Sequence, residues 1–184
     1  EKQLKDHIRR CGPITIAEYM NIVAEFYYAR GDVFGAGGDF TTAPEISQAF
    51  GEMIGLWSAV TWQAMGMPQP CQLVECGPGR GTLMADALRA ARQVPGFLEA
   101  AEILLIERSC ALKTIQRKAL KGHNAVWHHA LSDCPDRPII LLANEFLDTM
   151  PVRQFEKTTG GWQERQVDID KTAQFSFTLR PPCD

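Results

Sequence analysis

The hydrophobic positions of the chain recur first at helical spacing. From Thr15 onward, apolar residues follow one another every three or four positions, and Thr15 and Glu18 have the spacing of a capping box. A second, longer helix is predicted from Thr42, with Pro44 in its first turn, and it ends before Gly66. Its expected apolar face consists of Ile46, Phe50, Met53, Ile54, Trp57 and Val60.

After Pro70 the pattern changes to short apolar runs that alternate with helical segments. Strands are predicted at 72–76, 103–106, 125–127 and 139–143, and helices at 82–92 and 111–120. Strands that alternate with helices favour a parallel sheet covered on both faces. The expected fold class is therefore α/β, a Rossmann-like sheet with flanking helices that follows an N-terminal helical segment.

From Val152 onward the helical pattern stops, and the chain predicts antiparallel strands. These strands are expected at 152–156, 162–167 and 175–179, and Thr158 to Gly161 reads as a hairpin turn. We expect one structural domain overall. Within it, residues 1–70 form a helical segment that packs on the core and contributes to the active site. Residues 71–184 form the ligand-binding core with its C-terminal strands.

Composition and charge exclude several classes of protein. The 184 residues are 45% hydrophobic and 22% charged, as in a globular domain, and the net charge of -3 lacks the basic excess typical of nucleic-acid partners. The six cysteines include no CxxC pair, so no metal site is expected. The apolar runs are too short to span a membrane.

The main candidate for chemistry is the glycine-rich loop that runs from Glu75 to Gly81. It follows a predicted strand and opens a helix, so glycines permit a tight turn and the helix N-terminus favours an anionic ligand group. Glu75 is placed to accept hydrogen bonds from a ligand ammonium. A purely structural turn is the alternative. A nicotinamide site requires GxGxxG or GxGxxA, whereas Thr82 occupies the last of these positions, and no P-loop motif occurs.

Acidic residues also follow two later strands. Glu107 ends the second strand, where a ribose-binding acid is expected, and its alternative is a solvated or ion-paired carboxylate. Asn144, Glu145 and Asp148 follow the fourth strand and point toward the same crevice. For these residues the alternative is a helix start that is capped by Asn144 and carries acids in its first turn.

A third polar segment precedes the second helix, from Gly38 to Gln48. A loop followed by a helix cap accounts for Thr42 and Glu45. It does not account for Asp39, Thr41 or Gln48.

Three motifs in order resemble one known family. The chain reads GDFTTAPEISQAFGE, then ECGPGRGTL, then NEFLDTMPVRQF. They are similar to motifs of the MidA family of class I methyltransferases, which includes the mitochondrial complex I assembly methyltransferase. The resemblance runs from about Leu4 to Val167. Family members are longer than this chain, so we expect it to be a fragment.

The resemblance implies a class I methyltransferase fold, S-adenosyl-L-methionine as cofactor, and methylation of arginine in a protein partner. In mitochondria that partner is a subunit of respiratory complex I. Carboxylates suit both binding a guanidinium and accepting its proton, so the catalytic candidates are Glu45, Glu145 and Asp148. The cofactor-binding candidates are Asp39, Thr41, Thr42, Gln48, Glu75, Gly77, Gly79, Gly81, Thr82, Glu107 and Asn144.

Two other functions stay open at this point. One is a non-catalytic assembly factor that binds S-adenosylmethionine, and the other is a nicotinamide-dependent oxidoreductase. No presequence is visible at Glu1, so the bacterial cytoplasm is the first expectation for the compartment and the mitochondrial matrix the second. The sequence makes no prediction of the oligomeric state.

Overall fold

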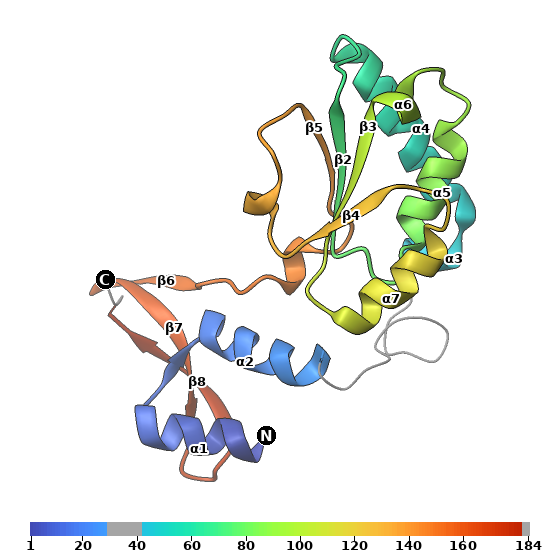
Figure 1. Cartoon of the computed structure of the whole chain (residues 1–184). Coiled ribbons are helices and arrows are strands. Elements are labelled where there is room, and N and C mark those ends of the chain that lie inside the picture. The colour runs from blue at the N-terminus through green and yellow to red at the C-terminus, as the bar shows by residue number, and fades with distance from the viewer. Residues whose placement is uncertain (29–41, 182–184) are drawn as a thin grey trace. The chain divides into compact units, whose positions relative to one another are not determined.

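A computed structural model describes residues 1–28 and 42–181 of the chain (Figure 1). The chain divides into two compact units, one made of residues 1–30 and 148–184 and the other of residues 31–147. This grouping differs from the expected division after residue 70, because the first unit takes strands from both ends of the chain.

The second unit contains a parallel sheet, as the alternating pattern predicted. Its strands pair in the order β4-β3-β2-β5, and every pair is parallel. The α/β fold class is therefore confirmed. The strands are β2 (Cys71–Cys76), β3 (Ala101–Ile106), β4 (Ala125–His128) and β5 (Ile139–Leu142).

Helices cover one face of this sheet. Alternate strand residues such as Leu73 and Leu105 share a buried core with Met84, Leu88 and Phe97 of the helices. The helices described in this unit are α3 (Ala43–Ile46), α4 (Gln48–Ala64), α5 (Thr82–Ala91), α6 (Phe97–Ala100) and α7 (Cys110–Ala119). The short 3-10 turn η1 (Leu131–Asp133) lies between β4 and β5.

The opposite face of the sheet has a smaller cover. Val74 and Leu104 are buried there with Cys134 and Phe146 packed against them, and both of these come from connecting segments. Further along this face Val126, Ile139 and Leu141 stay exposed. Helices were expected on both faces, and within the described residues of this unit they are found on one face.

The orientation of α4 corrects another expectation. Ser47 has an extended backbone that separates α3 from α4, so the predicted single helix is broken in two. The side chains expected to form its buried face are largely exposed, including Ile46, Met53, Trp57 and Val60. The buried side instead carries Gly51 and Gly55, because α4 lies so close to α5 that only glycine fits at the crossing.

The first unit is a small antiparallel sheet with two helices. β7 pairs with β1, β6 and β8, always antiparallel, and the hairpin between β6 and β7 was predicted. The capping box at Thr15 forms, with Glu18 N–H 3.1 Å from the Thr15 hydroxyl oxygen. The elements are α1 (Lys2–Cys11), β1 (Ile14–Thr15), α2 (Ile16–Tyr28), β6 (Phe155–Thr158), β7 (Gly161–Ile169) and β8 (Phe175–Arg180). The 3-10 turn η2 (Leu147–Thr149) precedes β6 in the chain and contains the boundary between the two units.

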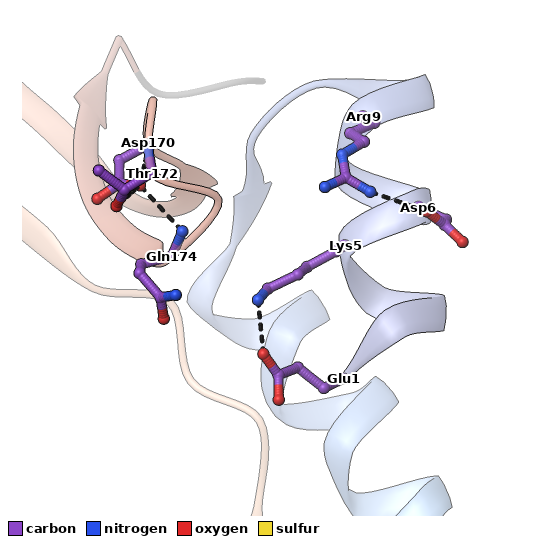
Figure 2. A network of polar contacts seen from close by, with 7 residues as sticks. All are labelled: Glu1, Lys5, Asp6, Arg9, Asp170, Thr172 and Gln174. Atoms are coloured by element: carbon purple, nitrogen blue, oxygen red, sulfur yellow. Dashed lines mark hydrogen bonds and ion pairs between the residues drawn. The ribbon is translucent and has the colours of Figure 1, made fainter.

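Polar contacts order the two ends of this unit (Figure 2). Asp170 accepts hydrogen bonds from the backbone N–H groups of Thr172 and Gln174 at 2.8 and 2.9 Å, which closes the turn between β7 and β8. On α1, Lys5 donates to Glu1 at 2.5 Å, and its ammonium lies 5.2 Å from the ring centre of Phe175. Helix α1, which the hydrophobic pattern did not predict, therefore packs against β8.

Candidate functional site

Three strands of the parallel sheet end at the same edge. Cys76 of β2 is in register with Ile106 of β3, and Glu75 is in register with Leu142 of β5. The residues that follow these strands, which include Gly77, Glu107 and Asn144, therefore leave the sheet side by side. Ligands of open α/β sheets bind at such a carboxyl edge.

The glycine loop has the backbone that only glycine adopts easily. Gly77, Gly79 and Gly81 have φ angles of 63°, 53° and 86°, all in the left-handed region. A Cβ atom added to Gly77 would lie 2.6 Å from the ring of Phe146, whereas one added to Gly79 would meet no atom within 4 Å. The loop is thus packed at its start and faces open space at Gly79, before α5 begins at Thr82.

Glu75 is buried at the end of β2 with 3% of its surface exposed. Burial raises the pKa of its carboxyl to about 8, and a hydrogen bond from the backbone of Met84 opposes that shift. One carboxylate oxygen, Oε2, has no hydrogen-bond partner among the described residues. A buried polar atom without a partner is costly. A ligand ammonium would supply the missing hydrogen bond.

Glu107 follows β3 and is held by three hydrogen bonds. Its Oε1 accepts from the backbone N–H groups of Arg108 and Ser109, both at 2.8 Å, and its Oε2 accepts from Gln116 at 3.1 Å. A carboxylate has about four acceptor positions. Three of these positions are filled, so one position on Oε2 is left for a ligand hydroxyl. The side chain of Arg108 donates instead to the carbonyl oxygen of His129 at 3.4 Å, and among the described residues it forms no ion pair with Glu107.

Gln116 of α7 is a residue that the sequence analysis missed. Its side chain is fully buried and lies between the glycine loop, Glu107 and Trp127 of β4. A polar residue within an otherwise mixed helix predicts a solvent-facing position, so its burial was not foreseen. The only sequence signal was its helical spacing of four from Leu120, which is buried too.

The polar segment at Thr42 is attached to the start of α5. Thr82 donates its hydroxyl to Glu45 Oε1 at 2.7 Å, so the short helix α3 is joined to the glycine loop. Thr42 precedes α3 as its N-cap, and its side chain makes no capping hydrogen bond. Gln48 donates to Glu52 at 2.8 Å, and Glu52 also binds Arg89 of α5. Asp39 and Thr41 lie outside the described residues.

The segment after β5 turns sharply. Asn144 is half-buried and Glu145 is exposed, with a φ angle of 47° that non-glycine residues seldom adopt. The alternative of a helix capped by Asn144 is wrong, because a turn forms there. Such backbone strain recurs at functional sites. Asp148 belongs to the other compact unit and stays a prediction.

Two kinds of feature are absent from the described residues. Within residues 1–28 and 42–181, no group of acidic, histidine or cysteine side chains is arranged to hold a metal ion. Among the same residues, no helix combines the length and hydropathy that a membrane span requires.

A family model and two relatives with similar sequences are described as methyltransferases. A family model described as "Putative S-adenosyl-L-methionine-dependent methyltransferase" matches residues 53–184. The chain is 40% identical over 210 residues to protein arginine methyltransferase NDUFAF7, mitochondrial, of Mus musculus, a match that covers 98% of this chain and 48% of that protein. For the protein of the same name from Danio rerio, identity is 39% over 196 residues, covering 92% and 46%. The chain thus spans about half the length of the curated relatives it matches.

Solved structures agree with the sequence relatives. A crystal structure of a COG1565 superfamily member from Burkholderia thailandensis, bound to S-adenosyl-homocysteine, has a TM-score of 0.76 and 32% identity, covering 100% of this chain and 50% of that one. A native crystal structure from the same organism has a TM-score of 0.72 and 32% identity, covering 99% of this chain and 48% of that one. As its three motifs predicted, the chain belongs to this family of S-adenosyl-L-methionine-dependent methyltransferases.

Proposed function

We propose that this chain binds S-adenosyl-L-methionine at the carboxyl edge of β2, β3 and β5 and transfers its methyl group to an arginine of a protein partner. The observation that carries the proposal is the unpartnered oxygen of buried Glu75 beside a glycine loop that is open at Gly79. An ammonium fits the first feature, and the close approach of a ligand fits the second.

Each end of the cofactor has candidate partners in the chain. The ammonium of its methionine part would bind Glu75, and its carboxylate would lie near the N-terminus of α5, where the helix dipole favours an anion. The remaining acceptor position of Glu107 would take one ribose hydroxyl. Thr42, Gln48, Thr82 and Asn144 stay proposed contacts of the same ligand, and so do Asp39 and Thr41.

Carboxylates are the proposed catalytic groups. When bound, S-adenosylmethionine supplies a methyl group activated by its positively charged sulfur. A guanidinium nitrogen forms the new bond to carbon as the bond from carbon to sulfur breaks, and it must lose a proton. Glu145 is the first candidate to hold the guanidinium and accept that proton, because it is exposed on a strained turn. Glu45 and Asp148 are the other candidates, although Glu45 also accepts a hydrogen bond from Thr82.

The substrate class follows from the relatives. The proteins from Mus musculus and Danio rerio are named protein arginine methyltransferases and mitochondrial. They support a protein substrate and favour the mitochondrial matrix, the second expectation for this chain, over the bacterial cytoplasm. The resemblance to the MidA family extends the proposal to a subunit of respiratory complex I.

Calorimetric titration tests the cofactor. The 184-residue chain is titrated with S-adenosylmethionine, S-adenosylhomocysteine and NAD in separate runs. We expect saturable binding of the first two and none of NAD. Saturable binding of NAD alone would support the oxidoreductase and contradict the proposal, as would the absence of binding by all three.

Transfer of a labelled methyl group then separates the enzyme from a non-catalytic assembly factor. The chain is incubated with labelled S-adenosylmethionine and a mitochondrial lysate, and labelled proteins are digested and analysed for methylarginine. We expect methylarginine in the presence of the chain and not with heat-inactivated chain. Binding of the cofactor without any transfer would favour the assembly factor.

A further inference from the structure

Gln116 uses its whole amide in one buried cluster. Its Nε2 donates to the carbonyl oxygen of Gly79 at 2.8 Å and to Oε2 of Glu107 at 3.1 Å. Its Oε1 accepts from the indole Nε1–H of Trp127 at 2.8 Å. The side chain has no exposed surface, so water does not compete for any of these positions. One residue therefore joins three segments that are distant in sequence.

Trp127 fixes which way the amide points. An indole nitrogen donates hydrogen bonds and accepts none, so the oxygen of Gln116 must face it. Both N–H groups then point toward Gly79 and Glu107 without a choice between orientations. Trp127 also makes a cation–π contact, because the guanidinium of Arg117 lies 4.9 Å from its ring centre.

The two groups that Gln116 binds belong to the proposed cofactor site. Gly79 is the open position of the glycine loop, and Glu107 is the acid proposed for the ribose. Glu107 has its Oε1 filled by two backbone N–H groups. The hydrogen bond from Gln116 fixes Oε2 and so directs the remaining acceptor position. Without it, only the two backbone N–H groups on Oε1 would set the orientation of the carboxylate.

We propose that Gln116 is a positioning residue that aligns Glu107 and the glycine loop, so that the chain recognises the 2′-hydroxyl side of the cofactor ribose. The inference rests on the proposed function. Gln116 touches no reacting atom, and its effect passes through the carboxylate that it orients. Its loss should therefore weaken recognition of the ribose more than it weakens binding of the rest of the ligand.

The test compares two ligands and several variants by calorimetry. S-adenosylhomocysteine and its 2′-deoxy analogue are titrated into the unaltered chain, Gln116→Met and Thr114→Val. Methionine has a similar length and no N–H donor. Thr114 is exposed on the same helix and donates its hydroxyl to the carbonyl oxygen of Cys110, so it serves as the matched control. Thermal melting is recorded for every variant.

For the unaltered chain and the control we expect S-adenosylhomocysteine to bind about tenfold more tightly than the deoxy analogue, the effect of one hydrogen bond. For Gln116→Met this ratio should fall to about one, while S-adenosylhomocysteine itself binds about 10-fold to 100-fold more weakly. A role limited to stability would lower the melting temperature and leave the ratio unchanged, which would overturn the inference.

Two further variants keep the outcomes distinct. Glu107→Gln should also bring the ratio to about one. A ratio lost in Glu107→Gln and kept in Gln116→Met would overturn the role of Gln116 alone. No binding by the unaltered chain would overturn the proposed function itself. If Gln116→Met does not fold, Trp127→Phe decides, since it removes the indole N–H that orients the amide. An unchanged ratio in that variant contradicts the inference.

Discussion

The ionisable carboxyl of Glu75 is buried in the folded chain, so its protonation depends on folding. Burial raises the pKa of its carboxyl from 4.5 to about 8. Between these two values the folded chain holds a proton that the unfolded chain has released. The free energy of unfolding contributed by this group therefore falls as the pH rises through this window. A bound ammonium would reverse the effect by favouring the charged carboxylate.

Glu75→Gln should remove this pH dependence, because glutamine stays neutral at every pH. We expect the free energy of unfolding of the variant to rise relative to that of the unaltered chain, by on the order of a few kcal/mol between pH 5 and pH 8. Urea unfolding at several pH values measures it. Glu99→Gln, at an exposed position of α6, should keep the slope of the unaltered chain. A Glu75→Gln variant that loses stability as steeply as the unaltered chain would contradict the burial argument.

Two glycines of the loop should respond differently to the same substitution. Valine at either position strains the left-handed backbone by about 1–2 kcal/mol. At Gly79 the new side chain projects into open space, so the chain should still fold and fail to bind S-adenosylhomocysteine. At Gly77 it would also clash with Phe146, so the melting temperature should fall further. Binding retained by Gly79→Val would place the ligand elsewhere.

Glu145 should matter for transfer and not for cofactor binding. Glu145→Ala removes an exposed carboxylate, so we expect an unchanged affinity for S-adenosylhomocysteine and a loss of methyl transfer of about 100-fold or more, the range of a lost general base. Asp136→Ala, another exposed acid of the same unit, is the matched control. Normal transfer by Glu145→Ala would exclude its catalytic role.

The pairing of α4 with α5 shows why one helix orientation was predicted wrongly. Apolar residues occur all around α4, so hydrophobic spacing alone does not identify its buried side. The close approach at Gly51 and Gly55 decides the orientation, since a Cβ atom at Gly55 would overlap the backbone of Ala87. The larger apolar side chains are then left outside.

Gly55→Ala should consequently destabilise the parallel unit, although alanine favours helices. We expect a loss of about 1–3 kcal/mol or more, the cost of overpacking, because backbone atoms of Ala87 have little room to move. Gln63→Ala, at an exposed position of the same helix, should change stability by less than about 0.5 kcal/mol. Denaturant unfolding compares the two. An unchanged stability for Gly55→Ala would show that the helices can separate at no cost.

The division into two units has a consequence for where the chain loses stability. The core of the first unit joins Leu4 and Ile8 of α1 to Val167 of β7, although these residues are about 160 positions apart in the chain. The parallel unit has its own core around Leu73 and Phe97. Each unit should therefore respond mainly to changes in its own core.

Ile8→Ala should test this directly. Truncation of a buried isoleucine costs about 2–5 kcal/mol. Hydrogen exchange should speed up at the amides of β7, and the amides of β2 should keep the protection seen in the unaltered chain. Arg10→Ala, on the exposed side of α1, should leave both strands unchanged. Equal loss of protection in β2 would indicate that the two units unfold together.

Local patterns were sufficient for the strands other than β1, the glycine loop, the capping box and the hairpin, because each depends on neighbouring residues. Alternation and apolar runs reflect the two faces of a strand, and positive φ angles require glycine at Gly77, Gly79 and Gly81. The motifs also identified the family. The contacts of Gln116 and the side on which α4 is buried came from packing between distant segments. A single sequence carries no direct record of such packing, since the same side chain satisfies several local patterns until a neighbour excludes all but one.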